Sequence, residues 1–391
     1  MFLPPLLSVL TEPVQLALDL VPFVRLLLPK QDHFAPHPGV PFEGYYTRIL
    51  TTTGNTILLI FSSVPGAKTH THHVHFSHII RPSGLRKHQE ADVLIAKFPK
   101  IDDPLFQTSP NGVQPFRREA VGDGLTANYD IRRNELKYQV KVDTPESGYV
   151  EADVEISGRM PWVGSEELST PEGIFSRLVF LLPLHWNIWS TASHTKFSIK
   201  RDGKIVEEGE GIAHVEKNWG TSFPLGWTWM QGFSSAQDPR TGSELTTFAL
   251  AGGKIIGQRA YLLGYRSPAL KWSFRPLFTM MPFGFQTPFI SEKMDARAGT
   301  AHLDICSVTR RLVIDAQAPP DHDGWIPMNC PLSNGHGNEY GFESFEAVIR
   351  IKAYVRTWYG GWMFVEESVL ENAALEFGGD YSFKASQTMP S

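Results

Sequence analysis

Cysteine is scarce in this chain of 391 residues, which contains only Cys306 and Cys330. The two thiols can form at most one disulfide, and neither belongs to a CxxC pair. The sequence therefore excludes a disulfide-stabilised scaffold and gives no sign of a zinc ribbon or a dithiol redox motif. A chain of this length can bury enough apolar surface to fold without such cross-links.

Clustered positive charge is also missing. Lysine and arginine total 36 against 41 aspartate and glutamate residues, the formal net charge is −5, and no basic run stands out. Tight binding to nucleic acid relies on clustered basic side chains, so we exclude nucleic acid as a partner.

The motifs of common cofactor-dependent and hydrolytic enzymes are absent as well. Neither a GxGxxG after a strand nor a GxxxxGK[ST] loop occurs, so nothing supports a nucleotide cofactor. The GxSxG elbow is missing too. A Ser-His-Asp triad assembled from distant residues stays open, because triads are defined by geometry. We expect the protein to use no cofactor.

One histidine-rich stretch, HTHHVHFSH at 70–78, raises the question of a metal site. On a strand, His73 and His75 would share one face, with His70, His72 and His78 on the other. Two faces cannot supply one tetrahedral site unless 70–73 form a loop, and no HExxH occurs. We expect no metal and interpret the stretch as a polar rim, with substrate contact by His75 or His78 as the alternative.

A long uninterrupted apolar run is absent from the N-terminal region. Residues 1–29 are apolar, but prolines and acidic residues keep every run below the ~20 residues of a membrane span. The first basic residue is Arg25 and no small-residue cleavage site is clear, unlike a secretory signal. We expect a short amphipathic helix around 14–28 that docks on the protein body or touches a membrane surface. An intracellular location, cytoplasmic or membrane-associated, is favoured, with the secretory pathway as the alternative.

An alternation of apolar and polar residues with a period of two dominates the rest of the chain. It is clearest at 137–143, 149–157, 195–207 and 347–356. Such alternation is typical of antiparallel strands with one buried and one wet face. TPESG and Asp202-Gly203 supply hairpin turns between neighbouring strands. Helical periodicity is scarce after residue 30, so the sequence predicts an all-β protein.

One barrel would be too large for this chain, so we predict two antiparallel β-domains. The N-terminal domain covers 35–215 and the C-terminal domain 216–391, after an apolar extension at 1–34. Each domain is expected to be a barrel or a sandwich.

Three tryptophans fall within HVEKNWGTSFPLGWTWMQG at 214–232. A strand at 227–233 places four side chains on one face: Trp227, Trp229, Gln231 and Phe233. Upstream, His214, Glu216 and Asn218 lie opposite Val215, Lys217 and Trp219. If these faces converge, they form an aromatic wall suited to a large, mostly apolar ligand. Solid core packing, with Glu216-Lys217 as a structural ion pair, is the alternative.

The stretch 216–231 resembles the signature of the tocopherol-cyclase-like family. The matching residues are Glu216, Lys217, Asn218, Trp219, Gly220, Ser222, Phe223, Pro224, Trp227, Trp229 and Gln231. FEGYY at 42–46, Pro161-Trp162 and ALEFGG at 374–379 resemble further family motifs in the expected order. Together they cover roughly residues 40–380. Tyr45 stands where the family usually has tryptophan.

This resemblance implies two lipocalin-like β-domains with a pocket at or between them. Plant members close a chromanol ring by adding a phenol oxygen to a prenyl double bond. Fungal relatives in specialised metabolism catalyse hetero-Diels–Alder reactions that join a quinone methide to a terpene alkene, and thereby make tropolone-sesquiterpene meroterpenoids. We take the fungal branch as nearer in character, which implies a pericyclase of the lyase or isomerase type.

The expected roles divide the candidate residues into two groups. Hydrogen-bond donors or a general acid for the reacting oxygen are expected among Glu216, Lys217, Asn218, Gln231 and His194. Substrate-binding walls are expected from Trp219, Phe223, Trp227, Trp229, Phe233, His185, Trp358 and Tyr354; His185 is a further candidate acid.

Two other functions stay open: a non-catalytic carrier of apolar small molecules, and a terpenoid hydratase or isomerase. The expected partners are a terpene and an aromatic or tropolone compound. The sequence does not give the exact substrates, the stereochemistry or the oligomeric state.

Overall fold

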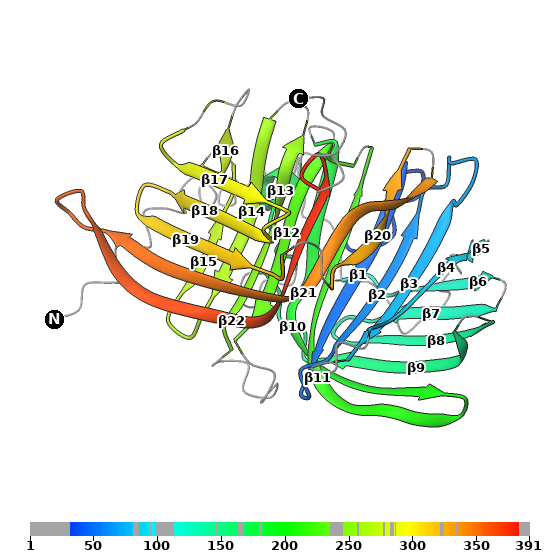
Figure 1. Ribbon diagram of the computed structural model, residues 1–391. Coiled ribbons are helices and arrows are strands. Elements are labelled where there is room, and N and C mark those ends of the chain that lie inside the picture. Colours follow the sequence, from blue (N-terminus) through cyan, green and yellow to red (C-terminus); the bar gives the residue numbers. More distant parts are fainter. Residues whose placement is uncertain are drawn as a thin grey trace.

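The computed structural model describes residues 32–382, except 81–85, 94, 98–112, 123, 146, 163–167, 178, 180–181, 222, 235–244, 256–257, 277, 282–284, 286, 321–323 and 334. The described part is all-β, as predicted, and is built from two antiparallel sheets (Figure 1). The amphipathic helix expected around 14–28 lies outside the described residues. Among the residues described, no helix is both long and apolar enough to cross a bilayer.

The first sheet has the strand order β4-β3-β2-β1-β11-β10-β9-β8-β7-β6-β5. Its strands are β1 (Phe42–Thr51), β2 (Thr56–Ser63), β3 (His72–Ile79), β4 (Arg86–Val93), β5 (Ile95–Lys97), β6 (Phe116–Gly122), β7 (Leu125–Ile131), β8 (Leu136–Thr144), β9 (Gly148–Ser157), β10 (Leu184–Arg201) and β11 (Lys204–Gly220). The sheet curls toward closure, so that β4 approaches β6. A short 3₁₀ helix, η2 (Gly173–Arg177), precedes β10.

The second sheet has the main order β15-β14-β13-β12-β22-β21-β19-β18-β17, with β16 beside β14 and β20 beside β21. Its strands are β12 (Gly226–Phe233), β13 (Thr247–Ile255), β14 (Gln258–Arg266), β15 (Lys271–Phe274), β16 (Met280–Met281), β17 (Ile290–Asp295), β18 (Thr300–Cys306), β19 (Arg310–Gln317), β20 (Ile326–Leu332), β21 (Gly335–Arg356) and β22 (Trp362–Gly379). The chain changes sheet between β11 and β12, at 221–225. Residues 216–220 thus still belong to the first sheet, and the division into domains stays a prediction.

The period-two segments form the predicted strands. Residues 137–143 and 149–157 lie in β8 and β9, which pair as a hairpin, and 195–207 spans the β10–β11 hairpin. Asp202 and Gly203 both have positive φ, 50° and 74°, as a tight turn between twisted strands requires. The apolar side chains of this alternation, such as Tyr138 and Val140, are buried in the core of the first sheet.

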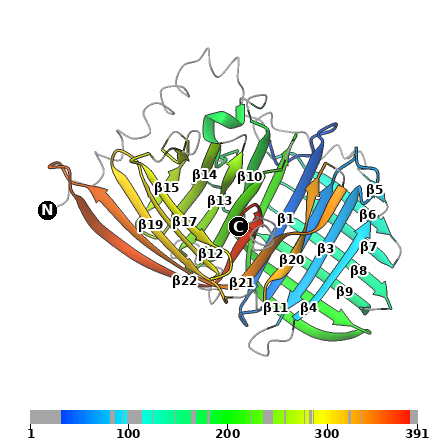
Figure 2. The ribbon, with the colours of Figure 1, turned by 45° about the horizontal axis from the view of Figure 1, so that its top comes forward.

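Each sheet encloses its own apolar core, and a third apolar cluster joins the two sheets. Figure 2 shows β12 and β13 beside β10 and β1, and β10 contacts β13 directly. The predicted Pro161-Trp162 motif lies at this junction. Trp162 packs against Gly264 of β14, and its indole nitrogen donates to Oγ of Ser273 over 3.0 Å. A methyl group at Gly264 would collide with the indole, which explains the glycine.

Candidate active site

A cavity of about 750 Å³ lies where the two sheets meet. The first sheet contributes side chains from β1, β2, β10 and β11, and the segment before β10 adds others. The second sheet contributes side chains from β12, β13, β14, β20 and β22. Most of the lining is apolar, including Ile60, Trp186, Ala260, Leu262 and Met328. A ligand bound there would be surrounded by hydrophobic surface with few polar groups to orient it.

Trp227 and Trp229 of β12 form an aromatic wall of this cavity. They are two positions apart on one strand and therefore share a face, whereas Met230 points into the core of the second sheet. Phe223 stands edge-on to Trp227 with ring centroids 4.7 Å apart, and Tyr46 of β1 stands edge-on to Trp229 at 5.0 Å. The face of β11 that carries Glu216 and Asn218 meets these indoles at the same cavity.

Each of the two indoles donates its N–H to a buried carboxyl group. Nε1 of Trp229 lies 3.0 Å from Oε2 of Glu216, which also lies 2.8 Å from Nε2 of His214. Nε1 of Trp227 lies 2.9 Å from Oε1 of Glu376. Both carboxyl groups line the cavity, and so does Asn218 beside Glu216 on the same face of β11. These bonds hold the indoles in fixed orientations.

Glu376 belongs to a buried acidic group that the sequence analysis missed. It faces Glu343 across the β21–β22 ladder, and the hydroxyl of Tyr46 donates to Oε1 of Glu343 over 2.5 Å. Burial raises the pKa of Glu376, the hydrogen bond from Trp227 lowers it and the nearby charge of Glu216 raises it, and the net value is about 7. Burial and Glu376 raise the pKa of Glu343 well above its usual value.

At least part of this acidic group is therefore protonated near neutral pH. A neutral carboxyl group in an apolar cavity can donate a proton or a hydrogen bond to a substrate oxygen. Glu376 lies within the ALEFGG motif at 374–379, so the motif was visible in the sequence. What the sequence could not show is that β22 pairs with β12 and brings this glutamate beside Trp227.

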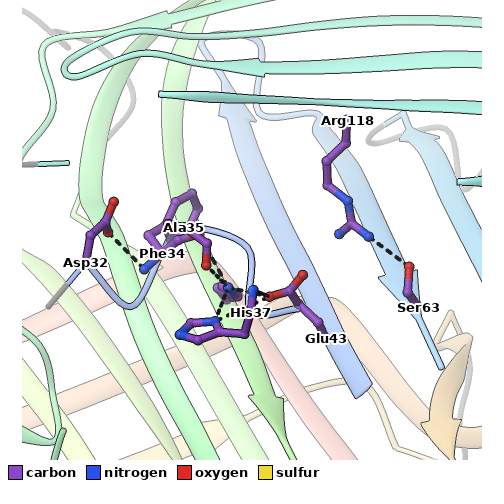
Figure 3. A network of polar contacts seen from close by, with 8 residues as sticks. Asp32, Phe34, Ala35, His37, Glu43, Ser63 and Arg118 are labelled. Carbon is purple, nitrogen blue, oxygen red and sulfur yellow. Dashed lines mark hydrogen bonds and ion pairs between the residues drawn. The ribbon is translucent and has the colours of Figure 1, made fainter. Parts of the chain in front are cut away.

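Lys217 points away from the cavity, to the opposite face of β11, as the alternation predicts. Its Nζ lies 2.6 Å from Oε1 of Glu43 and 2.7 Å from Nδ1 of His37, and it also donates to the backbone oxygen of Ala35. Figure 3 shows Ala35, His37 and Glu43 converging in this network. Lys217 is fully buried inside the first sheet, so it cannot touch a ligand in the cavity.

Lys217 and Glu43 form a buried ion pair. Burial lowers the pKa of Lys217 to about 8, although the charge of Glu43 opposes that shift. Burial alone would raise the pKa of Glu43, but the charge of Lys217 and the bond from His37 outweigh it and hold the value at about 2. The pair stays charged at neutral pH.

Trp219 also lies outside the cavity lining. Its indole is sandwiched between the rings of His37 and His185, with centroid distances of 3.7 and 4.1 Å. Nδ1 of His185 is in turn 2.9 Å from Oε2 of Glu172, whose side chain borders the cavity. Trp219 and His185 therefore do not line the cavity, but they hold Glu172, which does, through the hydrogen bond of His185.

Four further predicted residues also lie outside the cavity lining. Gln231 accepts a hydrogen bond from Arg48. Phe233 lies under the same guanidinium, with its ring centroid 5.9 Å away. Nε2 of His194 lies 3.5 Å from Oε2 of Glu210. Tyr354 stacks with Arg311 on the second sheet.

Trp358 was expected to stack on the substrate, but the structure places it in the turn after β21 with 95% of its surface exposed. It takes no part in the cavity wall. Of the thirteen predicted site residues, the cavity lining contains Glu216, Asn218, Phe223, Trp227 and Trp229.

The histidine-rich stretch does not gather into a metal site. His73 and His75 share one face of β3, and the ring of His73 lies 5.3 Å from that of His336, whereas His78 bonds Glu207 over 2.6 Å. Within the described ranges, no group of three or more His, Cys, Asp or Glu side chains is placed to hold a metal ion. Neither His75 nor His78 lines the cavity.

The family model described as tocopherol cyclase-like matches residues 34–264, more than half of the chain. The chain belongs to this family. The matched region includes Glu216, Trp227 and Trp229 but ends before Glu376. Family membership supports a catalytic role of the cyclase type.

Solved structures give the same fold. The structure of CghA with Sch210972 is 9% identical, with a TM-score of 0.53 and coverage of 88% of this chain and 89% of that one. The structure of CghA alone is also 9% identical, with a TM-score of 0.54 and coverage of 89% and 94%. Among proteins of curated function, the comparison found no significant match.

Proposed function

We propose that this protein is a cyclase that forms a dihydropyran ring by hetero-Diels–Alder addition. The reactants would be an o-quinone methide of the phenol or tropolone type and the alkene of a terpene. The cavity between the sheets supports this proposal most directly, because it combines about 750 Å³ of mostly apolar space with two indole walls and a few fixed polar groups. That volume lies within the range of pockets for small organic ligands.

A cycloaddition requires two apolar partners held face to face, and it requires no nucleophile. Orientation of well-placed reactants contributes ~7–11 kcal/mol in the favourable limit. Trp227 and Trp229 would stack against the partners, while the amide of Asn218 or the carboxyl of Glu376 would donate to the carbonyl oxygen of the heterodiene. The apolar walls would also keep water from quenching the quinone methide.

The same carboxyl can also generate the quinone methide from a hydroxylated precursor. Glu376 would transfer its proton to the departing hydroxyl group, and the carbon–oxygen bond would break to release water. The carboxylate would then take the proton of the phenol or tropolone hydroxyl, which completes the quinone methide and restores the acid.

The experiment that tests this proposal mixes the purified protein with a quinone-methide precursor and a terpene. We expect one stereoisomer of the dihydropyran, formed faster than in buffer. A racemic product at the buffer-only rate would instead support the carrier function, in which the cavity binds the same molecules without catalysis.

A second candidate is the protonation-initiated closure of a chromanol ring. The observation that favours it is the raised pKa of Glu376 beside two indoles. A proton delivered to an alkene carbon would create a cation, which the π faces of Trp227 and Trp229 would stabilise, and the phenol oxygen would then attack it.

Substitutions at Trp229 and Glu376, compared with a quinone methide already formed in solution, distinguish the two routes. In a cycloaddition, Trp229→Ala lowers turnover far more than Glu376→Gln, because shape and stacking dominate. In a protonation-initiated closure the ranking reverses, because Glu376 supplies the proton. The measurement is turnover with each substrate pair, after circular dichroism has shown that both variants are folded.

A further inference from the structure

A group of large apolar side chains at the free end of the β21–β22 hairpin points into solvent. Trp358 is 95% exposed, Tyr359 72%, Met363 55% and Phe364 54%. Figure 1 shows this end of β21 and β22 projecting beyond the other strands, at the left. The turn after β18 lies beside it, because the backbone of Arg356 bonds Thr309, and Val308 in that turn is also exposed. We call these residues the hairpin tip.

The hairpin tip combines aromatic residues with positive charge. The segment 354–364, YVRTWYGGWMF, has one charged residue, Arg356, and the neighbouring segment 307–311, SVTRR, adds Arg310 and Arg311. Neither segment contains an acidic residue. Arg311 pairs with Asp304, while Arg310 lies over the ring of Trp272 and Arg356 over that of Trp362.

This combination matches the surface of an anionic lipid bilayer. Tryptophan and tyrosine favour the zone between headgroups and acyl chains, because their rings are apolar and their N–H and O–H groups are polar. Arginine side chains near that zone are attracted to anionic headgroups. A partner protein or a second copy of the chain would also cover apolar side chains, but a narrow projecting end suits insertion between lipids better than a broad interface.

We propose that the hairpin tip is a docking site for an anionic membrane surface, with Trp358 and Tyr359 entering the interface. The site is separate from the cavity between the sheets, and it does not depend on the proposed reaction. It also differs from the membrane contact expected for residues 1–30, since it lies at the strand ends of β21 and β22 in the second sheet.

Vesicle flotation with the full chain tests the proposal. The vesicles consist either of phosphatidylcholine alone or of phosphatidylcholine with phosphatidylserine. We expect the protein to float with the serine-containing vesicles and to bind less at high salt, because salt screens the arginines. The double variant Trp358→Ala/Tyr359→Ala should bind about tenfold more weakly, as expected when two aromatic side chains no longer leave water.

A matched control comes from the hairpin between β10 and β11. Ile205 and Val206 there are 53% and 47% exposed, and the variant Ile205→Ala/Val206→Ala should float like the parent. Circular dichroism confirms folding of both variants.

Three outcomes would overturn the proposal. The first is that the parent protein floats with neither vesicle. The second is that the hairpin-tip variant floats as well as the parent, which would assign membrane binding to another segment such as residues 1–30. The third is that light scattering shows a dimer that the hairpin-tip variant loses while neither protein binds vesicles, which would assign the hairpin tip to a second copy.

Discussion

At the scale of single residues, the protonation of Glu376 decides how the site responds to pH. Its folded-state pKa is about 7, above the ordinary value of 4.5, because burial disfavours the charged form. The proton donor is therefore present below about pH 7 and is lost as pH rises through that value. We expect turnover to fall over the same range.

Folding stability also falls as the pH rises. Below pH 4.5 the carboxyl is neutral in both states, whereas above about 7 the folded protein must bury the charge. The free energy of unfolding should fall between these limits, by on the order of 3 kcal/mol from this group. Glu343, whose pKa is also raised, adds to the fall.

The variant Glu376→Gln isolates these effects. Glutamine keeps the side-chain volume and an oxygen that accepts the Trp227 bond, but it cannot supply a proton. Turnover at pH 6 should drop by about 10²-fold or more, and the dependence of thermal stability on pH should become shallower. Unchanged turnover in this variant would remove Glu376 from the chemistry.

Lys217 gives a contrasting prediction, because its charge pairs with that of Glu43 inside the first sheet. Lys217→Met leaves Glu43 buried without its partner and should lower the free energy of unfolding by about 3–5 kcal/mol. Urea unfolding measures this, and the added change Glu43→Gln should restore part of the loss. A stable Lys217→Met protein that is catalytically dead would instead return Lys217 to the active site.

At the scale of strands, the sequence predicted the faces of the strands and the partners within hairpins, but not the pairing of strands far apart in the chain. The alternation in β11 and β12 correctly placed Glu216 and Asn218 opposite Lys217, and Trp227 beside Trp229. Alternation carries no information about which distant strand comes next to a given one. The pairing of β12 with β22, which brings in Glu376, therefore became visible only in the structure.

The wrong prediction for Trp358 also arose because strand alternation does not show where a strand lies relative to distant parts of the chain. It follows a well-predicted strand, but the length of the β21–β22 hairpin carries the turn beyond the rest of its sheet and away from the cavity. Tyr354 lies on the same projecting part of β21, and its side chain stacks with Arg311.

Close packing of β22 on β12 positions one aromatic wall of the cavity. A methyl group at Gly378 would collide with the indole of Trp227. Gly378→Ala should therefore cost about 1–3 kcal/mol of stability, shift the tryptophan fluorescence and lower turnover by moving Trp227.

Gly66→Ala is the matched control, because no heavy atom lies within 4 Å of the position its Cβ would take. This variant should keep the parent's fluorescence and kinetics. If Gly378→Ala also kept both, Trp227 would have no part in shaping the site.

At the scale of the whole molecule, the site exists only because two sheets share a face. Each sheet fills its own core, and the cavity lies in the third apolar cluster between them. Period and turn signals are local and predicted the strands, while the length of the chain predicted two β units. The volume and position of the cavity depend on contacts between residues far apart in the chain, such as the Tyr46–Glu343 bond.

A crystal structure with a bound dihydropyran product tests the central claim most directly. We expect the terpene-derived part to lie against Trp227 and Trp229, with the ring oxygen within hydrogen-bond distance of Glu376 or Asn218. A product bound on the outer surface or inside the core of one sheet, with the cavity between the sheets empty, would contradict the account.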